Sequence, residues 1–482
     1  MKRINRLISL LMALCLTFPM FAGCDSETVS SPSPQGGGSA KPADASAVNQ
    51  AGTDGEEAET EPDYSWFEMP EETGKLVVYT DGSMGSSVMS PAVQIFKEHY
   101  PEIEVDFKVM GDAEFETLIR TEIPAGRGPD LLIFTTSDIP DPYKTMRTGL
   151  FVDLNPYFAS DEEIDLGDFL SPVMDEGVMN GKRFLVPLNY EVPILKMARS
   201  SLEEVGVTEE EIKTCDGFYE AAARFHELYP AATLYIDNFY GVGPENGDIQ
   251  NVFSAFGLRL IDFEADRVSV EEELLKRCAD LVKLYYKPDY NPDSQAIIEA
   301  SDRLYSVGWA LHNKYCLFDG VFTGLSTCMQ TAWRLKAMDD ELVLIAQTNR
   351  QNGVTAELVM NAAIPVGAAN KASAWKLLKI LLSDDIQAGH DERRYGLPYF
   401  WVGYPVRRAS LEAFLAPEAE GGDKAFVKWF MEVVQSPTDA MMFPQIHRKY
   451  LKEEILPYVR GTRSWPDAYK RFFNTVELYK DE

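Results

Sequence analysis

The sequence of 482 residues is poor in the residues and motifs from which metal, redox and common catalytic centres are built. It has five histidines, all scattered singly, and six cysteines that form no CxxC pair. It also lacks a Gly-x-Ser-x-Gly elbow, a phosphate-binding loop and a His-Glu-x-x-His sequence. These absences argue against a zinc cluster and against the most recognisable hydrolase and nucleotide-binding chemistries, so we expect no metal, no cofactor and no enzyme.

Basic residues are also fewer than acidic ones. The chain has 45 Lys and Arg against 76 Asp and Glu, a formal charge of −31. A body this acidic repels polyanions, so we expect no nucleic-acid partner. An acidic ligand is disfavoured as well, although a local basic pocket could override the net charge.

Only the N-terminus carries a long apolar run. Lys2, Arg3 and Arg6 precede the apolar stretch Leu7–Phe18, which is too short to span a bilayer comfortably. We interpret residues 1–23 as an export signal, and its removal leaves a charge of −34, since −31 − 3 = −34. The body is therefore expected outside the cell, held at the outer face of the membrane if the residue after the signal is lipid-modified.

That residue is Cys24. The sequence Phe21-Ala22-Gly23-Cys24 resembles a bacterial lipobox, in which the cysteine thiol receives diacylglycerol, although Phe21 stands where Leu is usual. An acylated cysteine holds a protein at the membrane surface. The alternative is an ordinary secreted protein. Residues 24–63 are rich in Ser, Pro, Gly and acidic residues and predict a disordered tether.

The remaining cysteines, Cys215, Cys278, Cys316 and Cys328, leave their state open. Four cysteines allow three pairings, and a body of about 420 residues can bury a core without disulfides. Free buried thiols and disulfide bridges are therefore equally compatible with the sequence.

The first part of the body alternates between strand and helix patterns. Ser90-Pro91 predicts the start of a helix, and Pro101 predicts its end. The expected elements are strands at 75–80, 103–109 and 131–134, and helices at 91–100 and 115–123. This β-α-β-α-β order predicts an α/β fold with a parallel sheet, whose ligand site lies at the carboxyl ends of its strands, here 81–86 and 135–138.

Three motifs early in the body resemble the extracellular solute-binding proteins of bacterial ABC importers, most of all the sugar-binding branch similar to maltose-binding protein. They are Ala125–Leu131, Gly149–Leu154 and Gly181–Pro187. This resemblance covers nearly the whole body, because further motifs follow in the family's order.

The later motifs come from the second half of the chain. Phe322–Met329 with Trp333 resembles a second-lobe strand and its following tryptophan, and Asn370–Lys379 resembles a helix after the return crossover. Gly396–Pro398 and Pro405–Arg408 resemble a turn that is split here by Tyr399–Tyr404, an insertion that fits either a cleft lid or a packed flap.

The resemblance implies a type II, two-lobed periplasmic-binding-protein-like fold, with open mixed sheets flanked by helices, a hinge and a central cleft. Lobe one would comprise 74–187 and 361–400, and lobe two 192–358 and 401–482. The hinge would lie at 188–192 and 359–363, where the chain crosses between lobes.

By position in the family pattern, ten residues are candidates for ligand contact in the cleft. Aromatic faces stack on sugar rings, and carboxylates, amides and hydroxyls bond to sugar hydroxyls. Each aromatic candidate is equally compatible with an ordinary core role, since 11% of the chain is aromatic. The candidates are Asp81, Ser83, Thr135, Thr136, Asn189, Tyr190, Glu191, Tyr235, Asn238 and Trp333.

The function implied by the resemblance is capture of a mono- or oligosaccharide and its delivery to the transmembrane subunits of an ABC permease, by a monomer. Alternatives are another polar solute such as a polyamine, which would suit the negative charge, an exported glycoside hydrolase, or presentation of a ligand to a membrane sensor. Asp289–Asp293 with Glu299 departs from a calcium-loop pattern, because Ser294 replaces the required glycine, and predicts a capped loop.

Overall fold

The computed structural model describes residues 63–71, 74–81, 85–136, 138–236, 253–286, 307–319, 324–389, 403–419 and 424–482. These residues belong to one compact unit, Pro62–Glu482. Several predictions lie outside the described residues: the export signal, Cys24, the tether, the loop at 289–299, and the candidates Ser83 and Asn238. None of the described helices is long and apolar enough to cross a membrane.

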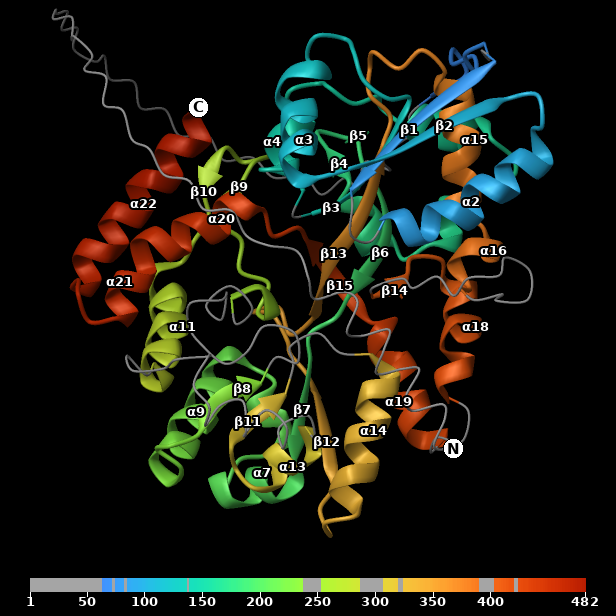
Figure 1. The fold of residues 1–482 in the computed structure, drawn as a ribbon. Coiled ribbons are helices and arrows are strands. Elements are labelled where there is room, and N and C mark those ends of the chain that lie inside the picture. The colour runs from blue at the N-terminus through green and yellow to red at the C-terminus, as the bar shows by residue number, and fades with distance from the viewer. Residues whose placement is uncertain are drawn as a thin grey trace, which may run out of the picture. The chain divides into compact units, whose positions relative to one another are not determined.

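The larger sheet has seven strands and contains the predicted β-α-β-α-β unit (Figure 1). β1 pairs in parallel with β2 and β3, whereas β13 runs antiparallel to β3 and β6, so the sheet is mixed. Its order is β14 (Tyr404–Pro405), β6 (Val186–Glu191), β13 (Val354–Ala363), β3 (Leu131–Thr135), β1 (Lys75–Asp81) and β2 (Glu104–Met110), with β15 (Pro437–Met441) also paired to β13.

Strand β3 is buried along its whole length because helices and neighbouring strands cover it. The buried carboxylate of Asp130, just before β3, accepts the backbone N–H of Val77 and that of Asn370, each at 2.8 Å. Asn370 in turn caps helix α15 (Lys371–Leu381) through the Ser373 N–H. One carboxylate thus joins β1, β3 and the start of α15, and the expected helix after Asn370 is confirmed.

The smaller sheet has four strands in the order β12 (Leu342–Ala346), β7 (Ile194–Ala198), β11 (Cys316–Asp319) and β8 (Thr233–Ile236). At its centre Lys196 of β7 and Asp319 of β11 form a salt bridge of 2.6 Å, with both side chains at most 2% exposed. The chain passes from β6 of the larger sheet to β7 across only Val192 and Pro193. The two sheets and their helices form a two-lobed α/β fold, as predicted.

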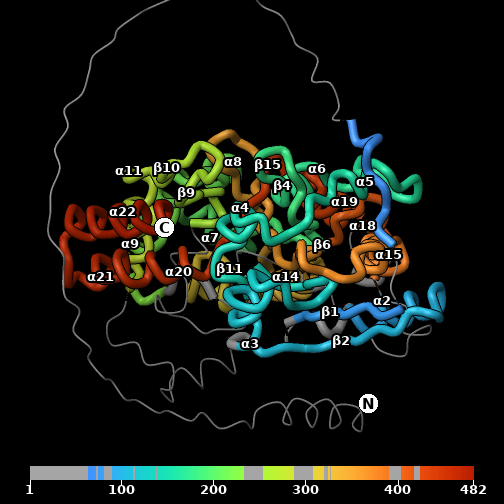
Figure 2. The backbone as a smooth tube through the Cα atoms, turned by 90° about the horizontal axis from the view of Figure 1, so that it is seen from above, coloured from blue at the N-terminus to red at the C-terminus, as the bar shows by residue number. Residues whose placement is uncertain are grey.

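Helices cover both sheets, and three of them near the C-terminus lie side by side in both backbone views (Figures 1 and 2). Those three are α20 (Gln445–Tyr450), α21 (Leu456–Val459) and α22 (Trp465–Asp481). The others are α2 (Gly85–His99), α3 (Asp112–Thr117), α4 (Pro142–Arg147), α5 (Asn155–Ser160), α6 (Ser171–Asp175), α7 (Arg199–Val205), α8 (Glu209–Ile212), α9 (Cys215–Leu228), α11 (Glu272–Tyr285), α13 (Val307–His312), α14 (Leu325–Lys336), α16 (Asp384–Gln387), α18 (Arg408–Ala419) and α19 (Lys424–Val434).

Two local predictions are wrong. Helix α2 begins at Gly85 instead of Pro91, so Pro91 lies inside the helix. The stretch 325–329 is helical and not a strand, because Leu325, Cys328 and Leu335 follow helical spacing and bury one face of α14. The strand that precedes this helix is β11, and Trp333 therefore lies in the third turn of α14.

The end of the predicted insertion belongs to the larger sheet. Tyr404 pairs with Tyr190, and the turn before it needs Gly403, whose φ is +83°. A side chain at this glycine would bring Cβ to 2.4 Å from the carbonyl oxygen of Tyr190. The chain therefore packs closely over β6 at this point, and residues 399–402 lie outside the described part.

Candidate functional site

Two strands that carry predicted ligand residues, β3 and β6, are both paired to β13 in the larger sheet. Thr135 is the last residue of β3, and Asn189 and Glu191 lie at the end of β6. β13 runs between these strands, with Met360 opposite both Thr135 and Asn189. The sheet therefore brings five of the ten candidates together: Thr135, Thr136, Asn189, Tyr190 and Glu191.

The two threonines are buried and hydrogen-bonded within the protein. The Thr135 hydroxyl and backbone N–H both donate to one carboxylate oxygen of Asp138, each at 2.7 Å. The Thr136 hydroxyl donates to the carbonyl oxygen of Leu358, also at 2.7 Å. The bonds to Asp138 stabilise the turn after β3, and the bond from Thr136 joins this turn to β13.

Asn189 and Tyr190 are buried as well. The side-chain oxygen of Asn189 accepts the N–H of Met360 at 2.8 Å, where the register between β6 and β13 shifts. The Tyr190 hydroxyl donates to the carbonyl oxygen of Val434 at 2.7 Å, and burial raises the pKa of this phenol. Both side chains therefore stabilise the point where β6 meets its neighbours.

Glu191 differs from these four because its carboxyl group is half-buried and faces a like charge. Glu357 of β13 lies directly opposite it in the strand register. Burial, reinforced by the charge of Glu357, raises the pKa of Glu191 to about 8. Burial also raises the pKa of Glu357, against the opposing effects of Arg448 and a hydrogen bond with Ser254. At neutral pH Glu191 is therefore mainly protonated and able to donate a hydrogen bond.

The other described candidates lie on separate elements. Asp81 ends β1, and Tyr235 is in β8 opposite Phe318 of β11. Trp333 projects from α14 with 72% of its side chain exposed. Because most of its surface is exposed, the indole of Trp333 is available to solvent and not part of the core.

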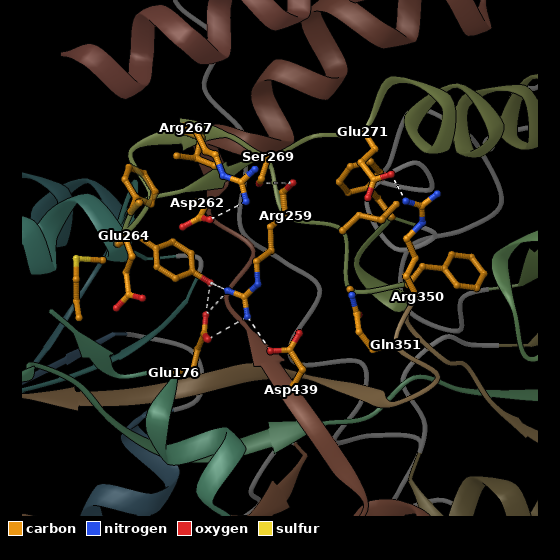
Figure 3. Close-up of a pocket in the computed structure, with 18 of the residues that line it drawn as sticks. Glu176, Arg259, Asp262, Glu264, Arg267, Ser269, Glu271, Arg350, Gln351 and Asp439 are labelled. Atoms are coloured by element: carbon orange, nitrogen blue, oxygen red, sulfur yellow. Dashed lines mark hydrogen bonds and ion pairs between the residues drawn. The ribbon is translucent and has the colours of Figure 1, made fainter. Parts of the chain in front are cut away.

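A separate pocket of about 550 Å³ contains none of the ten candidates (Figure 3). Its walls come from α4, α6, the β9–β10 hairpin (β9, Ile261–Asp262; β10, Arg267–Val268), the turn before β13 and β15. Figure 3 shows Arg259 extending between Glu176 and Asp439. The guanidinium lies 2.9 and 3.1 Å from the two carboxylate oxygens of Glu176 and 3.1 Å from Asp439.

Several polar groups of this pocket pair with one another. Tyr143 donates its hydroxyl proton to Glu176, and Arg350 pairs with Glu271. Burial raises the pKa of Glu176, although Arg259 opposes that shift. Arg259 thus binds segments on either side of the pocket, and its guanidinium is committed to carboxylates of the protein.

Nothing in the sequence pattern pointed to this cluster. Arg259 is 83 positions from Glu176 and 180 from Asp439, and none of the three stands in a motif. Among the described residues, no group of three or more His, Cys, Asp or Glu side chains is placed to hold a metal ion.

Comparison with known proteins finds a family match over part of the chain and a shared fold over most of it. Residues 81–272 match the family described as "Bacterial extracellular solute-binding protein". No curated protein matches the chain. Many solved structures share the fold, and three illustrate it.

The sugar-binding protein MalE from Xanthomonas citri is 15% identical, with a TM-score of 0.60 over 84% of this chain and 97% of its own. A periplasmic oligogalacturonide-binding protein from Yersinia enterocolitica is 16% identical, with a TM-score of 0.56 over 84% and 99%. The GacH receptor of Streptomyces glaucescens is 16% identical, with a TM-score of 0.52 over 85% and 100%.

The match over residues 81–272 and the shared fold agree with the resemblance predicted from the motifs. The matched family is described as extracellular, and the neighbours include sugar-binding proteins and an ABC transporter solute-binding protein. The chain has the two-lobed fold of the MalE-like proteins.

Proposed function

We propose that this protein captures a carbohydrate in a cleft between its two lobes and delivers it to an ABC permease. The observation that carries the proposal is the meeting of candidate-bearing strand ends from β3 and β6 on β13, in a fold shared with sugar-binding proteins. The lobes would comprise 74–187 with 361–400 and 192–358 with 401–482.

In this proposal the candidates divide into two roles. Thr135, Thr136, Asn189 and Tyr190 are buried and bonded to the protein, so they position the strand ends. We assign direct contact with the ligand to the other six candidates: Asp81, Ser83, Glu191, Tyr235, Asn238 and Trp333. Ligand bridging both lobes then favours the closed form, which the permease recognises.

The state of Glu191 favours a neutral polyhydroxyl ligand over a polyamine. A carboxyl group with its pKa raised to about 8 is mainly uncharged at pH 7. It therefore offers a hydrogen-bond donor and an acceptor to a sugar hydroxyl, while its attraction for an ammonium group is small. A bound cation would have to deprotonate it first.

We also propose that Cys24 is lipid-modified, that residues 24–63 tether the body to the membrane, that the protein is a monomer and that it has no catalytic activity. The expected intact mass of the membrane-extracted protein is that of the chain from Cys24 with its acyl groups. An unmodified N-terminal residue would refute the anchor, and release of shorter sugars from an oligosaccharide would refute the absence of catalysis.

A thermal melt of the mature chain against mono- and oligosaccharides, amino acids and polyamines tests the proposal. A ligand at about 100 times its dissociation constant stabilises the folded state by roughly 2.7 kcal/mol, or about 3 °C for a body of this size. A shift with one sugar series supports the proposal. A shift with amines alone would overturn the substrate class.

A further inference from the structure

Two cysteines lie close together on neighbouring helices, of which α11 packs against β8 of the smaller sheet. Cys215 is the first residue of α9, and Cys278 lies midway along α11, which packs against α9. The residue after Cys215 and the residue before Cys278, Asp216 and Arg277, form an ion pair. The guanidinium of Arg277 also lies 5.9 Å from the ring of Tyr219, so contacts beside both cysteines hold the helices in this register.

The two thiols contact each other directly. A hydrogen bond with the Cys215 thiol is the largest cause that raises the pKa of Cys278, and burial adds to it. Their exposure differs: Cys278 is 1% exposed, whereas Cys215 is half-buried. Solvent can therefore reach the Cys215 thiol but not the Cys278 thiol.

We propose that Cys215 and Cys278 are a dithiol pair that an external disulfide oxidises to an intramolecular disulfide. Both are free thiols in the structure. The proposal concerns a modification site distinct from solute capture, and the extracytoplasmic place of the class supports it, because disulfides form and persist there. Cys316 and Cys328 are fully buried and offer no thiol to an incoming oxidant.

The two thiols differ in their access to an external oxidant. Cys215 is half-buried at the start of α9, so an oxidant can reach its sulfur, whereas Cys278 is 1% exposed. The hydrogen bond with Cys215 and burial raise the pKa of Cys278, so Cys278 keeps its proton until a disulfide has formed on Cys215. Cys215 is thus the attacking thiol and Cys278 the resolving thiol.

The oxidation balances as two exchange steps with an external disulfide, written R–S–S–R. The Cys215 thiolate attacks one sulfur, forms a mixed disulfide and releases the first thiolate, which takes up a proton. Cys278 then loses its proton, attacks the Cys215 sulfur and releases the second thiol. The protein loses two protons and two electrons, and the external disulfide gains them as two R–SH.

The bond would constrain the chain between the two helices. It closes residues 216–277 into a loop, which includes β8 and the β9–β10 hairpin. A disulfide that closes a loop of this length lowers the conformational entropy of the unfolded chain, which raises the melting temperature by about 5 °C for a body of this size. The oxidised protein should therefore melt at a higher temperature than the reduced protein, and a reductant should remove the difference.

Oxidised glutathione, acting on the full chain reduced beforehand, tests the proposal. The products are digested without reduction and mapped by mass. We expect a Cys215–Cys278 linked peptide and the rise in melting temperature. Free alkylation of both cysteines after this treatment, or a link through Cys316 or Cys328, would overturn the proposal.

Single variants test the order of attack. Cys278→Ser should trap glutathione on Cys215, whereas Cys215→Ser should form no adduct at position 278. Cys316→Ala and Cys328→Ala serve as matched controls and should still form the linked peptide. An adduct on Cys278 in the Cys215→Ser variant would contradict the assigned roles, and the mapping of the unsubstituted chain does not depend on how the variants fold.

Discussion

Replacing Arg259 by Met should destabilise the protein by removing the cation that holds two carboxylates. The side chain of Glu176 is 11% exposed, and Arg259 contacts both of its oxygens at 2.9 and 3.1 Å. Asp439 loses its contact at 3.1 Å as well. Breaking a pair of this kind costs about 4 kcal/mol, which corresponds to roughly 4 °C in melting temperature for a body of this size.

The loss of stability in Arg259→Met should depend on pH, because Arg259 opposes the rise that burial causes in the pKa of Glu176. Burial already raises the pKa of Glu176 in the folded protein, and removing the guanidinium raises it further. A carboxyl group whose folded pKa exceeds its unfolded value loses stability as pH rises from the unfolded pKa to the folded one. The variant should therefore be less destabilised at pH 5 than at pH 8.

Denaturant unfolding at both pH values, followed by tryptophan fluorescence, measures the effect. Glu176→Gln combined with Arg259→Met should recover part of the loss, because the neutral amide needs no cation. Arg267→Met is the matched control, since Arg267 lies on the same pocket with a side chain that is 69% exposed. A loss below about 1 kcal/mol in Arg259→Met, equal at pH 5 and pH 8, would refute the reasoning.

Three further outcomes follow from other contacts. Between pH 5 and pH 8.5 the melting temperature of the protein should fall by about 4 °C more than that of Glu191→Gln, because burial raises the pKa of Glu191 to about 8 and its ionisation opposes folding; parallel slopes would contradict this. Lys196→Met should cost about 4 kcal/mol in denaturant unfolding, since Asp319 loses a buried partner at 2.6 Å; an unchanged midpoint would contradict it. Trp333→Ala should change stability by less than about 0.5 kcal/mol, because the indole is 72% exposed, and a larger loss would give it a packing role.

The fold was predictable where local pattern and burial agree. The strand at 131–134 was clear because β3 is continuously apolar, and Asn370 marked the start of α15. The proline rule at Pro91 predicts a start for α2 that is too late, because the residues before the proline are also helical. Motif order predicts a strand at 322–329, although the spacing of Leu325, Cys328 and Leu335 is helical.

The candidate site was only partly accessible from sequence. Strand ends in a parallel sheet meet by topology, so Thr135 and Asn189 could be placed near one another. Their hydrogen bonds to the backbone of β13 depend on a register shift that no local pattern encodes. The pairing of Glu191 with Glu357 likewise needs the strand register, and the Arg259 pocket joins residues from three distant segments.

Calorimetric titration of the mature chain with the sugar series that stabilises it tests the central claim most directly. The account predicts one binding site, with affinity lowered at least about tenfold in Asp81→Ala and in Glu191→Ala, a loss of about 1.4 kcal/mol each. Glu477→Gln, at an exposed position on α22, should bind as the unsubstituted chain does. Binding of polyamines alone, or sugar binding that neither site variant weakens, would contradict capture of a carbohydrate at the strand ends.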